Sequence, residues 1–230
     1  MTFMRGDILF VTAADTEILG LALAREKMPA DFPAVRALHL SELTEPGDLE
    51  EFAREIVPRA RVLVARILGG RAYFPEGFDL LSRACRDNGV PFLAMAGGRE
   101  IDPELSALGS VPLSTLTGAL EYFVHGGVDN YGQLLRFLAD RFLLTGYGSD
   151  PATPTPERGV YEAPGLPSVP EEAPVVASSS TGPIGFLGTF SPSTPWRGNS
   201  TGRAAARGRC SANPSRRQTR TEFPWPSANT

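Results

Sequence analysis

Apolar residues in the first hundred positions fall into four short runs, and polar stretches with helical spacing separate them. The runs cover residues 7–11, 35–40, 61–68 and 90–96. Short continuous apolar runs are typical of strands that are buried on both faces of a parallel sheet. After the first run, apolar residues recur at the spacing of a helix, at Ile18, Leu19, Ala22 and Leu23. The pattern therefore predicts alternating strands and helices.

Two further helices fit between the later strands. One opens near Glu45-Pro46-Gly47-Asp48 and has an apolar face that includes Leu49, Phe52 and Ile56. The other covers residues 76–88, and Gly89 stands where a glycine commonly ends a helix. Four strand–helix units in roughly 100 residues predict an α/β fold, an open and doubly wound parallel sheet of about four strands with flanking helices. This arrangement resembles that of flavodoxin.

The composition changes after the predicted sheet. Two helices are expected over residues 112–125 and 130–145, and they either pack on the sheet or lead to a further domain. A proline-rich stretch and then a tail with only two Ile, Leu or Val residues after position 176 predict an extended linker and a disordered end. We therefore divide the chain into an α/β domain (1–110), a helical extension (111–147), a linker (148–174) and a disordered tail (175–230).

The net charge of −4 conceals an asymmetry between the body and the tail. Residues 177–230 contain seven arginines and one acidic residue, which leaves 15 basic and 25 acidic residues in 1–176. An acidic body argues against nucleic acid as a partner, because nucleic-acid binding needs a basic surface. No apolar run reaches the ~18 residues of a membrane-spanning helix, and the start lacks the pattern of a signal peptide. We expect a cytoplasmic protein without a membrane partner.

The cysteines and histidines predict structural roles. Cys85 and Cys210 are too few and too far apart for a disulfide framework or a metal site. Cys85 lies on an apolar helix face and is expected in the core, and His39 lies in an apolar strand and is expected to be buried. The residues assemble no nucleophile, base and orienting group, so no catalytic residue and no metal ligand is predicted.

Three loops at the expected carboxyl ends of the strands are the candidate binding site, because ligands of doubly wound sheets bind there. Paired glycines allow close approach of a backbone, and an arginine can hold a carboxylate, which suits a ligand rich in carboxylate or amide groups. The alternative is that these loops are plain turns with solvated arginines. The candidate residues are Asp15, Thr16, Gly69, Gly70, Arg71, Gly97, Gly98 and Arg99.

The same loops carry a family resemblance. Segments 12–17 (TAADTE), 68–74 (LGGRAYF), 96–105 (AGGREIDPEL), 126–130 (GGVDN) and 159–161 (GVY) stand in the chain in this order. Together they resemble collinear motifs of the large subunits of CobN-type cobaltochelatases, which are related to magnesium chelatases. The match covers residues 7–176. Phe74 replaces a usual tryptophan, and Gly98-Arg99 replaces an acidic pair, which speaks against a cation site in that loop.

The resemblance implies a part in cobalamin biosynthesis. In this family the intact enzyme inserts cobalt into a corrin precursor, hydrogenobyrinic acid a,c-diamide, and AAA-type ATPase partner subunits use ATP to drive the reaction. The insertion residues of the family lie downstream of the matching segment, so none is assigned here. The expectation is an amino-terminal fragment that needs no cofactor of its own and is inactive alone.

Two alternatives stay open. The first is a non-catalytic module that binds a corrinoid, another tetrapyrrole or a protein partner, through the candidate residues above. The second is a flavin-binding electron-transfer domain, but Asp15 stands in the loop that would hold the flavin phosphate and would repel it. A colourless preparation would dispose of the flavin hypothesis.

The tail suggests a lost reading frame. The family continues after Pro174-Val175-Val176 with a strand and a helix, whereas this chain changes to Arg, Ser and Pro. A shift by one base after Val176 is compatible with the family-like sequence GVVFYRAHWLSGN. We expect residues 177–230 to be translated out of frame, the rival being a genuine disordered basic tail. Sequencing the locus for a long frame opened by a single-base change distinguishes the two.

Overall fold

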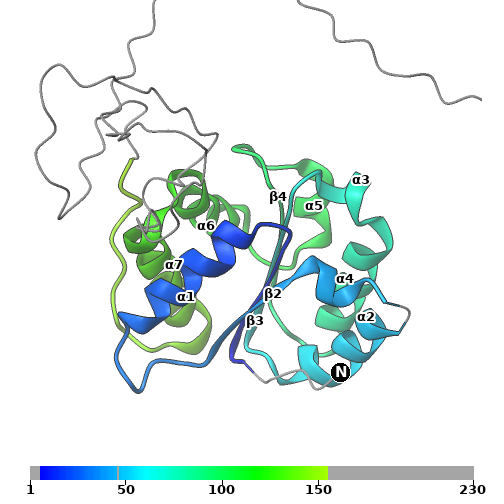
Figure 1. Ribbon diagram of the computed structural model, residues 1–230, viewed down its shortest axis with the longest axis horizontal. Coiled ribbons are helices and arrows are strands. Elements are labelled where there is room, and N and C mark those ends of the chain that lie inside the picture. Colours follow the sequence, from blue (N-terminus) through cyan, green and yellow to red (C-terminus); the bar gives the residue numbers. More distant parts are fainter. Residues whose placement is uncertain (1–5, 46, 155–230) are drawn as a thin grey trace, which may run out of the picture. The chain divides into compact units, whose positions relative to one another are not determined.

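The computed structural model describes residues 6–45 and 47–154 (Figure 1). Within them four parallel strands form one sheet in the order β2-β1-β3-β4. Ile8 of the central strand β1 stands opposite Val35 of β2 on one side and Val62 of β3 on the other. The predicted open parallel sheet is confirmed. The strands are β1 (Ile8–Thr12), β2 (Val35–His39), β3 (Val62–Ile67) and β4 (Phe92–Ala96).

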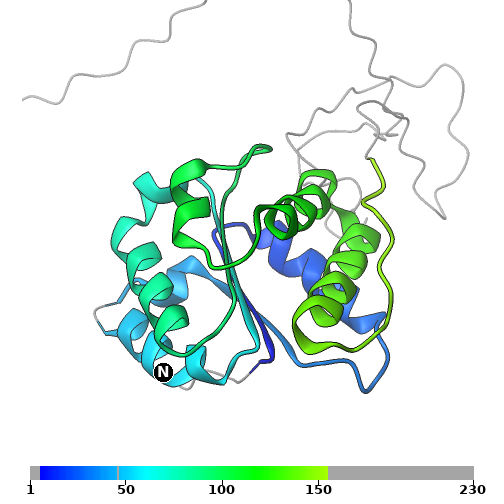
Figure 2. The same cartoon turned by 180° about the vertical axis from the view of Figure 1, so that it is seen from behind.

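Helices cover both faces of the sheet. Figures 1 and 2 show α1, α6 and α7 on one face and α2, α4 and α5 on the other. The strands can therefore be apolar throughout, as their sequences are. The helices are α1 (Asp15–Glu26), α2 (Asp48–Glu51), α3 (Gly70–Tyr73), α4 (Pro75–Asp87), α5 (Pro103–Leu108), α6 (Leu113–His125) and α7 (Gly127–Leu143).

Alternate residues of each strand enter two separate cores. In β3, Val62 and Val64 pack with residues of α1, α6 and α7, and Leu63 packs with residues of α4 and α5. Successive side chains of a strand point to opposite faces, so Arg66 lies on the same face as Val64. A charged residue thus enters the layer between the sheet and α1, α6 and α7.

Helix α4 ends as its sequence predicts. Gly89 adopts a φ of +65° just after the helix. Its N–H donates to the Arg86 carbonyl (3.3 Å), and the next N–H, from Val90, donates to the Cys85 carbonyl (2.8 Å). This is the Schellman arrangement that a glycine favours. Cys85 is buried as predicted, and burial raises the pKa of its thiol to about 12, so the thiol stays protonated and is a poor nucleophile.

Several details differ from the sequence prediction. The helix expected from 45 onward is α2 followed by a π turn, η2 (Phe52–Ile56), and a 3₁₀ turn, η3 (Val57–Arg59). Pro58 has no N–H to donate, so the α-helical ladder cannot continue through it. Helix α5 was not predicted, although Asp102 caps it by accepting hydrogen bonds from the N–H groups of Glu104 and Leu105.

The position of His39 also differs from the prediction. It is half-buried at the carboxyl end of β2, not buried inside the strand. Its Nδ1 accepts a hydrogen bond from the Ser41 backbone N–H (3.2 Å), and the Glu42 side chain accepts one from the His39 N–H (3.1 Å). These bonds cap the 3₁₀ helix η1 (Leu40–Leu43), because the backbone turns sharply there. His39 is satisfied, but as a cap.

Helices α6 and α7 pack on the sheet, which was one of the two roles expected for them. Phe123 of α6 lies edge-on to Phe10 of β1, with 6.4 Å between ring centroids, and Leu134 of α7 is in the same core. None of the helices within 6–45 and 47–154 is long and apolar enough to cross a bilayer. The predicted linker (148–174) is described only as far as residue 154, and the predicted frameshifted tail lies outside the described residues.

The chain then returns along α7 as a segment without helix or strand, residues 144–154, which we call the return segment (Figure 2). Asp140 of α7 accepts hydrogen bonds from the N–H groups of Tyr147 and Gly148, both at 2.7 Å. Asn130 accepts one from the Thr153 N–H at 2.8 Å. Side chains of α7 thus satisfy backbone groups of the return segment that have no partner in a helix or a sheet.

Candidate functional site

The switch point of this sheet lies between β1 and β3. The chain passes from β1 to β2 on one side, whereas β3 and β4 stand on the other. In open α/β sheets, ligands bind beyond the carboxyl ends of the strands at such a point. Asp15 and Thr16 begin α1 after β1, and the predicted loops 69–71 and 97–99 follow β3 and β4. The structure brings all three predicted loops to one edge of the sheet.

A buried ion pair occupies the switch point. The Glu17 and Arg66 residues are only 5% and 8% exposed. One Arg66 nitrogen, Nη1, donates to Glu17 Oε1, and the Thr12 hydroxyl donates to Glu17 Oε2 at 2.6 Å. Both carboxylate oxygens of Glu17 are therefore engaged by neighbouring strands. The pair links the carboxyl ends of β1 and β3 through the first turn of α1.

Arg66 also reaches the loop after β4. Its Nη2 donates to the carbonyl oxygens of Gly97 (2.7 Å) and Gly98 (3.2 Å). Its guanidinium lies over the ring of Phe123, 5.1 Å from the centroid, as in a cation–π contact. Its Nε has no acceptor among the described residues. One side chain on β3 thus holds groups that follow β1 and β4.

The surroundings of this ion pair exclude most solvent, because both residues are buried. Burial lowers the pKa of the Arg66 guanidinium below its usual range, and nearby Tyr131 acts in the opposite direction. Burial also raises the pKa of the Tyr131 phenol, against the effect of Arg66. An arginine guanidinium is not deprotonated in proteins, so Arg66 carries a positive charge. Its charge needs Glu17 nearby, since an unpaired buried charge is strongly unfavourable.

The loop after β3 is a tight elbow. Gly69 and Gly70 both have positive φ, +81° and +58°, which favours glycine. A Cβ at Gly70 would stand 3.4 Å from the Ala96 Cβ, so this elbow approaches the end of β4 closely. Arg71 donates to both oxygens of Asp79 on α4, at 3.0 and 3.1 Å. Its charge is therefore already paired within the unit.

Of the remaining predicted residues, Gly97 is half-buried and the others are exposed. The Asp15 side chain is 94% exposed, and its Oδ1 lies 3.9 Å from His39 Nε2. Thr16, Gly98 and Arg99 are also exposed. Within residues 6–45 and 47–154, Arg99 pairs with no carboxylate. Of the two predicted arginines, only Arg99 is available to an outside ligand without loss of an internal ion pair.

The chemistry that this edge supports is limited. Among the described residues, no three His, Cys, Asp or Glu side chains cluster in a way that could hold a metal ion. The central charges, Glu17 and Arg66, neutralise each other and hold backbone groups. The described edge therefore provides exposed backbone, the available Arg99, the exposed Asp15 carboxylate and uncharged side chains, and these suit binding better than bond making.

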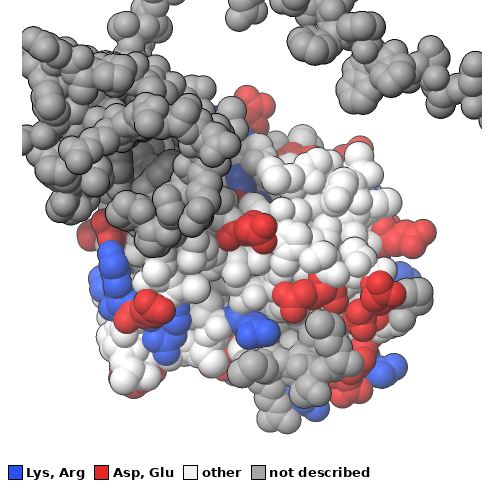
Figure 3. Space-filling model, in the orientation of Figure 1, with Lys and Arg blue, Asp and Glu red and all other residues white. Residues whose placement is uncertain are grey.

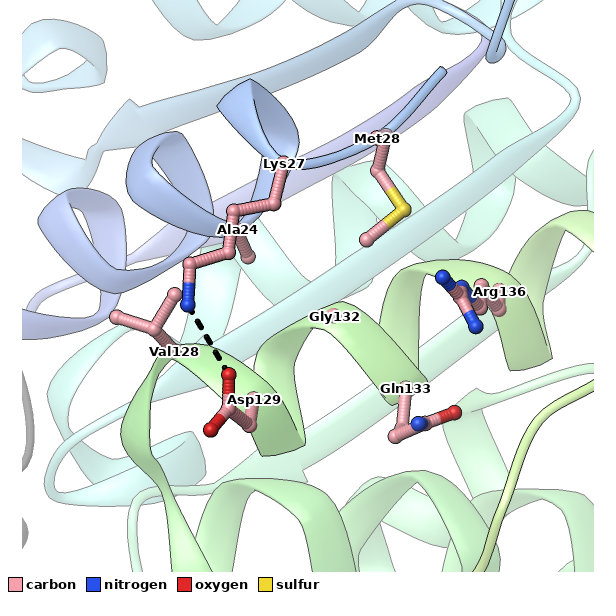
Figure 4. Close-up of a pocket in the computed structure, with 8 residues that line it drawn as sticks. All are labelled: Ala24, Lys27, Met28, Val128, Asp129, Gly132, Gln133 and Arg136. Atoms are coloured by element: carbon pink, nitrogen blue, oxygen red, sulfur yellow. Dashed lines mark hydrogen bonds and ion pairs between the residues drawn. The ribbon is translucent and has the colours of Figure 1, made fainter.

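Two surface hollows lie away from these loops. One of about 210 Å³ lies between the end of α1 and α7, where Lys27 pairs with Asp129 at 3.1 Å (Figure 4). In the same view Met28 points toward Gly132, and Arg136 lies at one end. The other, about 330 Å³, lies between α1 and β2 and includes Arg25 and Arg36. Neither was predicted.

Sequence reasoning missed the buried pair. A signal for it was present, since Arg66 interrupts the otherwise apolar run VLVARI of β3. An arginine inside a strand that is covered on both faces needs a buried partner. Glu17 stood within a quoted motif but was not singled out. Its partner could not be identified because the two residues are 49 positions apart.

Comparison with known proteins gives a consistent picture. No family model matches the chain. The aerobic cobaltochelatase subunit CobN of Pseudomonas aeruginosa is 29% identical over 141 residues, which cover 61% of this chain and 11% of the relative. A Sinorhizobium protein of the same name is 30% identical over 156 residues, 67% of this chain and 12% of the relative.

A solved structure agrees with these relatives. The catalytic subunit of cobaltochelatase from Mycobacterium tuberculosis superimposes with a TM-score of 0.54 at 30% identity, over 74% of this chain and 13% of that chain. The described α/β unit is thus related to subunits of metal chelatases that handle cobalt. More specifically, the chain belongs to the CobN family. It spans only 11–12% of the length of the curated relatives.

Proposed function

We propose that this chain supplies the amino-terminal α/β domain of a CobN-type subunit and performs no metal insertion of its own. The intact assembly would insert cobalt, as substrate, into hydrogenobyrinic acid a,c-diamide during cobalamin biosynthesis in the cytoplasm. AAA-type ATPase subunits would supply the energy from ATP. Membership of the CobN family supports the pathway. The division into an α/β domain, a helical extension, a linker and a tail belongs to the same proposal.

The proposal that this domain inserts no metal is supported by the buried ion pair of Glu17 and Arg66. The switch point is where this class of fold would place a ligand. Here a guanidinium, a carboxylate and a threonine hydroxyl fill it with bonds to one another. A reacting group would have to displace Arg66 from Glu17 and from the Gly97 carbonyl.

An insertion assay tests this proposal. Purified chain is mixed with the ATPase partners, ATP, cobalt and the corrin precursor, and the product is followed by its absorbance. The intact P. aeruginosa relative serves as the positive control. The expected rate equals that of the partners without the chain. Cobalt insertion above that background would refute the proposal.

A second candidate function is a non-catalytic module that binds the corrin precursor. Arg99 favours it, because this arginine is exposed next to Gly98 and pairs with no described carboxylate. Titration with the precursor, followed by fluorescence, separates the two functions. Binding in the micromolar range that Arg99→Ala weakens and Arg83→Ala leaves unchanged would favour the module. Absence of binding at millimolar precursor would favour the inert domain.

A further inference from the structure

Two large apolar side chains are exposed at the carboxyl edge of the sheet. Leu68 is 51% exposed and Tyr73 is 68% exposed. Leu68 lies against Gly97, and Tyr73 lies over Gly69, where an added Cβ would stand 3.0 Å from the Tyr73 Cβ. We call Leu68, Gly69, Tyr73 and Gly97 the elbow patch. Figure 3 shows a largely uncharged surface where α3 and α5 lie, with acidic residues at its margin.

Two arginines are bonded to groups beneath the elbow patch. Arg66 binds the carbonyls of Gly97 and Gly98, and Gly97 lies against Leu68. Arg71, on the short helix that ends at Tyr73, is anchored to Asp79 of α4. These bonds fix the backbone on which Leu68 and Tyr73 stand, and tyrosine is enriched among the residues that dominate protein interfaces.

The charges around the patch favour a protein surface over the corrin precursor. A corrin precursor presents carboxylates and amides, so it needs free cations. Arg66 and Arg71 are both neutralised by carboxylates of this unit, the exposed Arg99 lies outside the patch, two positions after Gly97, and the patch itself carries no charge. An apolar protein surface requires no such cations. Contiguous exposed apolar patches are common at protein contact sites.

The length of the relatives indicates what covers the patch. The matched segment makes up 11–13% of the related subunits, so most of each subunit lies outside it. Both faces of the sheet are already covered by helices of the unit itself. Contacts with the rest of a subunit would therefore form on the outer surface of the unit, where the elbow patch is apolar and uncharged.

We infer that the elbow patch is the docking surface through which this unit binds another region of a CobN-type subunit, by burial of Leu68 and Tyr73. The inference rests on the proposed function and adds the partner surface to it. The occupant is a protein surface with an apolar centre. A corrin ligand or a second copy of this chain would be a different outcome.

The experiment mixes the full chain with the P. aeruginosa relative from which the 141-residue matched region has been removed. Binding is measured by sedimentation velocity. The double variant Leu68→Glu/Tyr73→Glu is expected to bind at least ten-fold more weakly than the wild type. Leu113→Glu, a matched change of an exposed leucine on α6, is expected to bind like the wild type. Thermal melting checks that all variants are folded.

A second measurement covers the case in which the shortened relative does not fold. Residues 1–154 of this chain replace the matched region in the intact relative, and calorimetry follows unfolding. With the wild-type patch, the grafted unit should unfold together with the rest of the subunit in one transition. With the Leu68→Glu/Tyr73→Glu patch, the grafted unit should unfold in a separate transition. Equal binding of both variants, or equal melting profiles, would overturn the inference.

Other readouts separate the remaining outcomes. Loss of corrin binding in the double variant with unchanged protein binding would make the patch a ligand site and overturn the inference. If the wild-type chain forms dimers and the double variant does not, the inference would also be overturned. The insertion assay tests the proposed function separately from the docking inference. Whether the chain inserts cobalt does not depend on what the elbow patch binds.

Discussion

Two arginine–carboxylate pairs lie at the same edge of the sheet, and their surroundings differ. The side chains of Arg66 and Glu17 are 9% and 7% exposed, whereas those of Arg71 and Asp79 are 36% and 42% exposed. Removal of one partner of a buried pair leaves a charge without water, whereas an exposed charge is simply hydrated. The buried pair therefore organises the switch point, and the exposed pair only anchors a short helix.

The largest effect is expected from Arg66→Ala. The change leaves the Glu17 carboxylate buried without a cation and frees the carbonyls of Gly97 and Gly98. The expected loss is about 3–5 kcal/mol in the free energy of unfolding, measured with urea. Arg83→Ala, on the exposed face of α4, is the control. If Arg66→Ala lowers the free energy of unfolding by less than about 1 kcal/mol, burial does not distinguish the two pairs.

A double variant sharpens the same contrast. Glu17→Gln combined with Arg66→Met removes both charges, and the glutamine can still accept from the Thr12 hydroxyl. Apolar or neutral replacement of a whole buried pair is often tolerated. We expect a free energy of unfolding higher than that of either single variant, with a coupling energy of about 2 kcal/mol. Additive losses would mean that the two residues act independently.

Asp140 provides an intermediate case, in which a carboxylate is paired with backbone groups and not with an arginine. Burial raises the pKa of Asp140, but hydrogen bonds from Thr145, Tyr147 and Gly148 lower it more. The Asp140→Asn side chain cannot accept all these hydrogen bonds, because an NH2 group, which only donates, replaces one of the two carboxylate oxygens. The expected loss is about 1–2 kcal/mol at pH 7.

The pH dependence of Asp140 has a definite sign. Its folded-state pKa is depressed, so its contribution to stability is present above the unfolded pKa of about 4. That contribution is lost as pH falls through the lower folded pKa. The difference between wild type and Asp140→Asn in urea unfolding should narrow below about pH 4. A difference that stays constant down to pH 2 would contradict the assigned hydrogen bonds.

The smallest effect is expected from Arg71→Ala. Both side chains of its ion pair are partly hydrated, so the loss should be about 0.2–1 kcal/mol at low salt. Since salt screens such pairs, the difference from wild type should disappear near 1 M NaCl. The Arg66→Ala loss should persist at the same salt concentration. If both losses respond equally to salt, the two pairs do not differ in burial as described.

Much of the fold could be predicted because it depends on local patterns. The apolar runs at β1 to β4 place the strands within two residues of their observed ends. Gly89 and the apolar spacing on α4 mark a helix and its end without tertiary information. Helix α5 was missed although its cap, Asp102 followed by Pro103, is a local signal.

The candidate site was predicted only in part. The order of strands and loops placed the diglycine segments at one edge of the sheet, because carboxyl ends of parallel strands meet there. The partners of the arginines could not be predicted. Arg71 binds Asp79 eight residues away, and Arg66 binds Glu17 through a layer that exists only after the sheet has formed. The role of Asp15, Thr16 and Arg99 in ligand contact stays a prediction.

By itself the sequence determined the alternation of strands and helices, the helix stops and the family, because these depend on residue type and spacing along the chain. Only the tertiary structure decided that the switch point is filled by Glu17 and Arg66 and that Leu68 and Tyr73 remain exposed. The physical reason is desolvation. Whether a charge is neutralised or an apolar group is left in water depends on which distant segments cover it, and no local pattern contains that information.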